Sequence, residues 1–402
     1  MPAPDLQARR ARAAVAALFL TNGAVFFNVV PRYPQIKAEL DVGNAVFGGA
    51  VAGMPIGALL AGLLAGAAVR RFRSSRVAAF GIVLMTVVTV AVPFVPNWVA
   101  FWGVLFVLGA LDAVVDVAQN AHGLRVQRIY RRSIVNSLHG VWSVGAVLGG
   151  LMGSAAAGLH LPLAVHLTIS GALFSAVALT AYRFLLPGRD DAERAAAVPE
   201  GGRSLPGTSA RERWRALAGP AMRTVVLLGV VAACGALVED AGASWGALFL
   251  SGDLGADAAT AGLAVVVFQT AMTVGRLTGD RAVDRFGQRT VARAGGLLAA
   301  AGMGAALAVP TVPAALAGFA LAGLGVATLV PAAMHTADEL PGLPHGTGLT
   351  VVSWLLRGGF LVSPLLVGAV ADLAGLRVGL LSVVLAGVIT IALSRTLANR
   401  AV

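Results

Sequence analysis

The sequence has little that would support enzyme chemistry. Its 402 residues include a single cysteine, Cys234, so no disulfide can form within the chain. The six histidines and this cysteine show no metal-ligand spacing, and the chain carries no phosphate-binding loop. The sequence therefore predicts no cofactor, no metal site and no enzymatic activity.

Charged residues are also scarce. They make up 12% of the chain, about half the fraction of an ordinary soluble domain, whereas 57% of the residues are hydrophobic. The mean hydropathy is +0.82. Water cannot be the solvent around most of such a chain, so we expect membrane lipid to surround it.

The positions of the basic residues explain the net charge of +11, which would otherwise fit a nucleic-acid-binding protein. Arginines cluster in alternate connections between apolar segments, whereas the remaining connections hold only Arg32, Lys37 and Arg377. Arginine-rich loops stay on the cytoplasmic side of a membrane. The pattern therefore predicts a multi-pass protein of the cell membrane, with both termini in the cytoplasm and no nucleic-acid partner.

Twelve apolar segments are long enough to cross a bilayer, which requires about 20 residues each. They are 13–31, 44–68, 77–95, 98–124, 134–158, 162–185, 221–250, 258–280, 290–309, 312–336, 346–371 and 375–396. A polar stretch divides them six and six. We therefore expect an all-α membrane protein with an N-terminal six-helix bundle (1–186), a cytoplasmic linker (187–220) and a C-terminal six-helix bundle (221–402).

The two halves resemble each other. Ala-Val-Arg-Arg-Phe at 68–72 aligns with Ala-Val-Asp-Arg-Phe at 282–286, each between the second and third spans of its half. Further on, Gly150 aligns with Gly368. These matches occur in the same order in both halves, so they favour a duplicated six-helix unit.

The most specific motif is Gly-Arg-Leu-Thr-Gly-Asp-Arg-Ala-Val-Asp-Arg-Phe-Gly at 275–287. It is similar to the loop between the second and third helices of a half in the major facilitator superfamily, whose transporters are built from such repeats. In that family the acidic and basic residues of the motif pair across the cytoplasmic face and hold one conformation. The resemblance assigns this conformational-latch role to Arg276, Asp280, Arg281, Asp284 and Arg285.

Further segments resemble one bacterial branch of twelve-helix permeases within that superfamily. They are Arg-Tyr-Pro-Gln-Ile-Lys at 32–37 and Ser-Leu-His-Gly-Val-Trp-Ser at 137–143. The antiporter motif of the superfamily is incomplete here, because Ala146 replaces its proline. The fourth span also lacks the basic residue of drug antiporters. Both departures argue against a typical multidrug antiporter.

Ionisable residues inside the predicted spans are the candidate site, because a charge at a helix centre costs at least about 2.5–3.5 kcal/mol on insertion. Asp112 and Asp116 lie one helical turn apart in the fourth span, and Asn120 continues the same polar stripe. Asn22 and Asn28 in the first span either line a cavity or bridge helices. The other candidates for binding a proton or the substrate are His139, Glu239 and Arg357. Arg32 and Asp240 are candidate outer-gate residues.

Two of these charges are predicted to lie near the membrane midplane, one in each half. At a rise of 1.5 Å per residue, Asp112 lies about 18 Å and Arg357 about 16 Å from the cytoplasmic end of its span. One hypothesis gives Asp112 and Asp116 the proton or the substrate charge, with Arg357 as their counter-charge. The other makes Asp112 and Arg357 a permanent structural pair, and His139 can equally satisfy a packing hydrogen bond.

These observations predict a secondary active transporter that moves a small polar organic solute by alternating access. The expected energy source is a proton gradient, and the expected partners are the small-molecule substrate and membrane lipid, with the chain acting as a monomer. One alternative keeps the fold but exports hydrophobic drugs or metabolites. The other is a membrane sensor or assembly subunit that binds a ligand without moving it.

Overall fold

The computed structural model describes residues 6–130, 134–188, 219–340, 343 and 347–397. Within them, twelve helical segments are long and apolar enough to cross a membrane. This confirms the predicted all-α fold with twelve membrane-capable helices. The chain divides into two compact units, Met1–Pro199 with Gly255–Val266, and Glu200–Leu254 with Val267–Val402.

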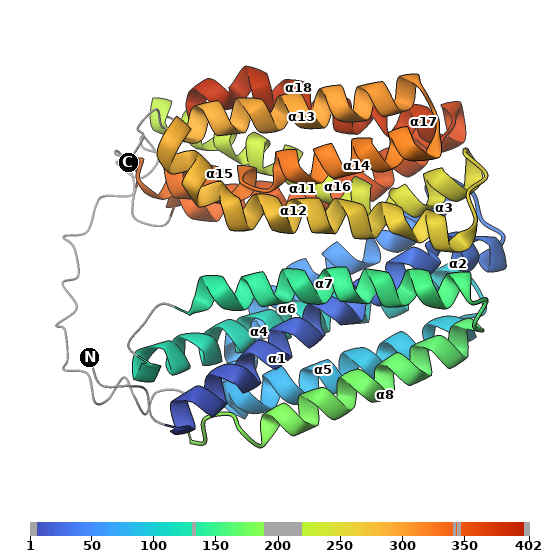
Figure 1. Cartoon of the computed structure of the whole chain (residues 1–402). Helices are drawn as coiled ribbons and strands as arrows, with labels where there is room; N and C mark the ends of the chain where they lie inside the picture. The colour runs from blue at the N-terminus through green and yellow to red at the C-terminus, as the bar shows by residue number, and fades with distance from the viewer. Residues whose placement is uncertain (1–5, 131–133, 189–218, 341–342, 344–346, 398–402) are drawn as a thin grey trace. The chain divides into compact units, whose positions relative to one another are not determined.

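The first unit holds the N-terminal helices (Figure 1). They are α1 (Leu6–Val29), η1 (Val30–Arg32), α2 (Tyr33–Leu40), α3 (Asn44–Val51), α4 (Gly53–Phe72), α5 (Ser74–Val90), η2 (Val92–Phe94), α6 (Trp98–Tyr130), α7 (Val135–Gly158) and α8 (Leu163–Tyr182). The most extensive helix pairs in this unit are α4 with α6 and α1 with α7, and α5 packs against both α6 and α8.

The second unit is built in a similar way. Its helices are α11 (Pro220–Gly252), α12 (Ala258–Phe286, whose first residues group with the first unit), α13 (Gln288–Ala308), α14 (Val312–Val326), α15 (Leu329–Asp338), α16 (Thr347–Ala374), α17 (Leu376–Gly379), α18 (Leu381–Leu393) and η3 (Ser394–Thr396). Here α11 packs along α16, and α13 packs against α14 and α18.

Several helices continue beyond the predicted spans. α1 begins at Leu6 rather than at residue 13, and α6 runs to Tyr130 rather than to 124. The apolar pattern marks only the part of a helix that lipid surrounds, whereas arginine is a good helix former and extends the helix into water. Residues 189–218, most of the predicted linker, lie outside the described residues.

Prolines coincide with interruptions in two of the spans. α3 gives way to α4 at Ala52, three residues before Pro55, and α14 gives way to α15 just before Pro331. Proline lacks the N–H that would bond the carbonyl four residues earlier, and its ring crowds that carbonyl. Pro364 differs, because it lies inside the continuous helix α16.

Two polar contacts show the internal repeat in three dimensions. The Ser74 hydroxyl lies 2.8 Å from His122 Nδ1, and the Thr336 hydroxyl donates to Gln288 Oε1 at 2.9 Å. Each pair joins the first residue of α5 or α13 to a residue near the end of the fourth span of its half, and each is separated by 48 residues. The duplicated sequence therefore makes equivalent contacts in both units.

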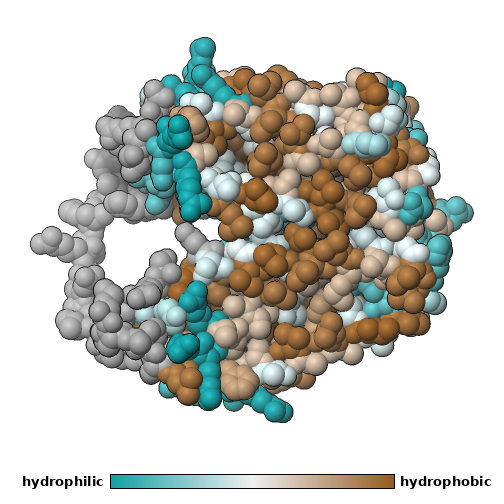
Figure 2. Space-filling view, viewed as in Figure 1, coloured by the Kyte–Doolittle hydropathy of each residue, from teal (hydrophilic) through white to brown (hydrophobic). Residues whose placement is uncertain are grey.

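Large apolar side chains cover the outer surface of the helices. Leu63 is 70% exposed, Leu64 67% and Leu373 88%. On the face shown in Figure 2, hydrophobic side chains cover the middle of each unit, while hydrophilic ones gather toward the helix ends. This distribution suits a lipid environment, where leucine gains nothing from being buried in the protein.

Candidate functional site

Three of the predicted residues of the first unit form one hydrogen-bonded chain. Asn120 Nδ2 donates to Asp116 Oδ1 at 3.0 Å, within α6. The Oδ1 atom of Asn120 lies 3.1 Å from His139 Nε2 on α7. Because a carboxamide oxygen only accepts, His139 donates through Nε2. The chain therefore connects the Asp116 carboxylate on α6 with the imidazole on α7.

Asp112 lies beside this chain and next to Asn22 of α1. Asn22 lies within hydrogen-bonding reach of the Asp112 carboxylate, which is half-buried and close enough to Asp116 for their charges to interact. The Asn22 side chain is 3% exposed. Phe19, also on α1, packs edge-on against the His139 ring at 5.3 Å between ring centroids. Three helices of the first unit thus support a single acidic cluster, formed by Asp112, Asp116, Asn120 and His139.

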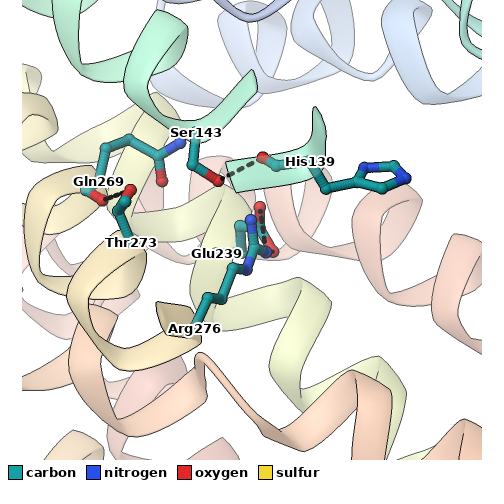
Figure 3. Close-up of polar contacts among 6 residues, drawn as sticks. All are labelled: His139, Ser143, Glu239, Gln269, Thr273 and Arg276. Atoms are coloured by element: carbon teal, nitrogen blue, oxygen red, sulfur yellow. Dashed lines mark hydrogen bonds and ion pairs between the residues drawn. The ribbon is translucent and has the colours of Figure 1, made fainter. Parts of the chain in front are cut away.

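The second unit contains an ion pair between two predicted residues. Arg276 Nη2 on α12 lies 3.3 Å from Glu239 Oε2 and 3.4 Å from Glu239 Oε1 on α11 (Figure 3). The two side chains are 34% and 17% exposed. The family resemblance assigns Arg276 to the conformational latch, and that role stays a prediction. In the structure Arg276 lies on α12 and is paired with Glu239, a candidate residue for binding a proton or the substrate.

Arg276 continues a polar stripe on α12. Gln269 and Thr273 precede it by seven and three residues, so the three side chains share one face of the helix. The Thr273 hydroxyl donates to the Gln269 carbonyl oxygen at 2.7 Å (Figure 3). The sequence analysis missed Gln269 because a lone amide carries no charge, although its spacing from Thr273 and Arg276 is a signal that could have found it.

The remaining residues of the latch motif lie at the end of α12, and their side chains are exposed: Asp280, Arg281, Asp284 and Arg285. Arg285 covers the Phe286 ring, with 5.4 Å from its guanidinium carbon to the ring centroid. The latch role of this exposed group stays a prediction.

Asp240 and Arg357 lie in contrasting surroundings within the second unit. Asp240 on α11 accepts a hydrogen bond from Ser244 at 3.1 Å, and Ser363 of α16 lies beside the same carboxylate. Arg357, also on α16, has an exposed side chain. The structure therefore holds Asp240 in the α11–α16 packing and leaves the Arg357 guanidinium accessible.

Arg32 is buried at the end of the first span. Its guanidinium donates to Gln35 Oε1 and, at 2.8 Å, to the Leu161 carbonyl oxygen. Gln35 in turn donates to Glu39 at 2.7 Å. The Arg32 side chain, in a residue only 2% exposed, thus ties η1 to the connection before α8, and the gate role stays a prediction.

A second buried polar group is formed by Asn28, Ser170 and His166, of which the sequence analysis named only Asn28. Asn28 donates to Ser170 at 2.8 Å and accepts from His166 Nε2 at 2.9 Å. All three residues are at most 5% exposed. These contacts join α1 to α8, so the bridging interpretation of Asn28 fits the structure.

The sequence model of the Major Facilitator Superfamily matches residues 15–239 and 230–400. The chain belongs to this superfamily. A membrane protein of Rhizobium meliloti, MosC, is 31% identical over 94% of the chain and 87% of its own length. The transporter y4wD of Sinorhizobium fredii is 27% identical over 90% of the chain and 92% of its length.

Solved structures of superfamily transporters share the fold. The nucleoside transporter NupG matches with a TM-score of 0.74 and 14% identity, over 96% of this chain and 97% of NupG. A bacterial homologue of the human lysosomal transporter Spinster matches with a TM-score of 0.68 and 17% identity, over 96% and 95% of the two chains. As a member of the major facilitator superfamily, the protein is a multi-pass membrane transporter and not an enzyme.

Proposed function

We propose that this superfamily member is a proton-coupled secondary transporter for a small polar organic solute. It works as a monomer in the cell membrane, surrounded by lipid, with both termini in the cytoplasm. The observation that carries the proposal is the acidic cluster, in which Asp116, Asn120 and His139 are hydrogen-bonded in sequence beside Asp112.

Two carboxylates in the acidic cluster support proton coupling. Asp112 and Asp116 lie one turn apart on α6, inside a helix that is otherwise largely apolar. Their mutual repulsion falls when a proton or a cationic group binds between them. His139, at the end of the hydrogen-bonded chain, can pass a proton to or from this pair. A bound proton then shifts the transport cycle only if the two conformations differ in proton affinity.

Arg357 is the proposed counter-charge to the aspartates. From the sequence we expect it at a similar depth to Asp112, and its side chain is exposed. If Arg357 pairs with Asp112 in one conformation and separates from it when Asp112 is protonated, proton binding is coupled to the conformational change. This role is separate from that of Arg276, which is already paired with Glu239.

The polar side chains of the second unit favour a polar solute over a hydrophobic one. The Glu239–Arg276 pair presents a carboxylate and a guanidinium together in a partly exposed position. A purely apolar ligand would remove water from both charges without replacing its hydrogen bonds, which costs free energy. Nucleosides belong in the first screen, because NupG shows that this fold can carry them.

The experiment has two steps. Purified protein is first screened against polar metabolites, nucleosides and hydrophobic dyes by thermal unfolding in detergent, and the best ligand is then followed into proteoliposomes with and without a pH gradient. We expect uptake of a polar solute that the gradient accelerates. Uptake that ignores the gradient would contradict proton coupling, preferential transport of ethidium-like dyes would indicate efflux, and tight binding without flux would indicate a sensor.

A further inference from the structure

Gln269 on α12 is buried without hydrogen-bond partners for its side chain. The residue is 1% exposed, and neither Nε2 nor Oε1 has a partner among the described residues. Leaving a buried polar group unpaired destabilises the folded protein. An amide has a donor and an acceptor side by side, so one ligand group with the complementary arrangement can satisfy both atoms.

The backbone beside Gln269 is rigidly held. A β-carbon on Gly323 of α14 would lie 2.3 Å from the Phe268 carbonyl oxygen, so only glycine permits this approach. On α11, a β-carbon on Gly242 would lie 2.5 Å from the Phe268 ring. Phe268 is therefore fixed between two helices, and the amide that follows it starts from a defined position. Pre-positioned groups of this kind are typical of recognition sites.

The neighbours of Gln269 on the same helix face are already engaged. Thr273 donates its hydroxyl to the Gln269 backbone, and Arg276 is paired with Glu239. Of these three side chains on the α12 face (Figure 3), Gln269 is the one whose two polar atoms both lack a hydrogen-bond partner among the described residues.

Gln119 in the first unit shows what a structural glutamine looks like in this fold. It is also fully buried, but its Nε2 donates to the Leu18 carbonyl oxygen at 3.0 Å and so ties α6 to α1. Only its Oε1 atom is unpartnered among the described residues. Gln119 is therefore a matched control for a glutamine that holds helices together.

We propose that Gln269 recognises the solute through a pair of hydrogen bonds. Its Nε2 donates to a carbonyl oxygen of the solute, and its Oε1 accepts from the N–H next to that carbonyl. The solute class is therefore one with a cis-amide edge, as in lactams, cyclic ureas and pyrimidine-type rings. This inference rests on the proposed function, because it names the substrate class of the same transporter.

The test compares ligands that differ only in this edge. Binding of 2-pyrrolidinone, ethyleneurea and uracil to the purified full chain is measured beside that of their fully N-methylated counterparts, which keep the carbonyl and lose the N–H. We expect at least one N–H ligand to bind at least tenfold more tightly than its methylated counterpart, because a site built for hydrogen bonding rejects a ligand that leaves its polar atoms unpaired.

Variants assign the preference to Gln269. Gln269→Leu should bind both members of the pair equally, and the near-isosteric Gln269→Glu, which loses the donor, should weaken binding of the N–H ligand at least fivefold. Gln119→Leu should lower the melting temperature and keep the preference. An unchanged preference in Gln269→Leu, or a wild-type protein that binds no N–H ligand of the panel more tightly than its methylated counterpart, would overturn the inference.

The two proposals fail in different ways. Gln269-dependent binding without any flux into proteoliposomes would leave the recognition role intact and remove the transport cycle proposed above. Proton-driven transport that depends on Asp112 but keeps its selectivity in Gln269→Leu would support the transport cycle and overturn the recognition role of Gln269.

Discussion

Gly109 of α6 lies so close to Met54 of α4 that a β-carbon on it would come within 2.0 Å of the Met54 carbonyl oxygen. The C-terminal half repeats this approach between Gly323 of α14 and Phe268 of α12, at 2.3 Å. Without a hydrophobic driving force between helices in lipid, such close backbone contact is a main source of stability. The helices that carry the acidic cluster and Gln269 are thus positioned by glycines.

The first prediction concerns these glycines. Gly109→Ala and Gly323→Ala should each destabilise the protein by about 1–3 kcal/mol, because the added methyl group must push two helices apart. Gly103→Ala, on the same helix as Gly109, is the control: nothing lies within 4 Å of its β-carbon position. It should be neutral or slightly stabilising, since alanine is the better helix former. Thermal unfolding in detergent measures the difference, and equal melting temperatures for Gly109→Ala and Gly103→Ala would refute it.

The second prediction concerns the Glu239–Arg276 pair. Glu239→Gln or Arg276→Gln leaves one charge without its partner, so each should reduce transport at least tenfold. Because the pair is partly exposed to solvent, each should cost only about 1 kcal/mol or less in stability. The double variant should regain the stability and not the transport. Glu339→Gln is the control, because it breaks an exposed pair with His335 whose side chains are 56% and 66% exposed; transport restored in the double variant would assign the pair a purely structural role.

The third prediction concerns the buried His122. Its Nε2 accepts from the Leu186 N–H at 3.2 Å, so its Nδ1 donates to Ser74 at 2.8 Å. His122→Phe removes both bonds and should cost about 1–3 kcal/mol, through lost bonds and buried groups left unpaired. Thermal unfolding measures the loss. The exposed His335→Phe should change stability by less than about 0.5 kcal/mol, and an equal loss in both variants would show that the buried contacts add nothing.

The fourth prediction concerns two aspartates between α11 and α12. The hydroxyl and backbone N–H of Thr260 donate to Asp257 and hold its pKa below the ordinary 3.8, whereas burial raises the pKa of Asp253. A carboxyl group whose pKa is lower in the folded state stabilises the protein at pH values above its unfolded-state pKa. This contribution is lost as the pH falls through the folded-state pKa. Asp257→Asn should therefore be less stable than the wild type near pH 7, with the difference shrinking below about pH 4.

Asp253→Asn should change the stability of the protein in the opposite direction. A raised folded-state pKa means that the charged form is disfavoured in the native protein, so removing the charge should stabilise the protein near neutral pH. Melting temperatures across the pH range measure both variants. The same sign for the two substitutions would contradict the assigned causes.

The sequence predicts most of the fold because its signals are local. Apolar length marks the twelve spans, and the match of 68–72 with 282–286 marks the repeat. Proline alone does not predict a break, because Pro55 and Pro331 lie at interruptions whereas Pro364 lies inside the continuous helix α16. Helix ends were less predictable, because hydropathy marks only the part of a helix that lies in lipid, whereas backbone hydrogen bonds can continue beyond it. For example, α6 continues to Tyr130.

The site was predictable only where charge marks it. Asp112, Asp116 and His139 stand out in an apolar chain, but their connection through Asn120 depends on how α6 and α7 pack. Arg276 was assigned by its motif to the latch, and its partner Glu239 lies 37 residues earlier, on another helix. Gln269 and His166 carry no signal of burial in the sequence, because burial depends on neighbouring helices.

The proposed function depends on the acidic cluster coupling solute movement to protons. Solute-driven acidification or alkalinisation inside proteoliposomes, followed with a trapped pH dye, tests it in the wild type and in Asp112→Asn and Asp116→Asn. We expect the wild type to move protons with solute. We expect at least one of the two variants to lose proton movement at least tenfold, while still binding the solute. Full proton movement in both variants, or solute flux without protons in the wild type, would contradict the claim.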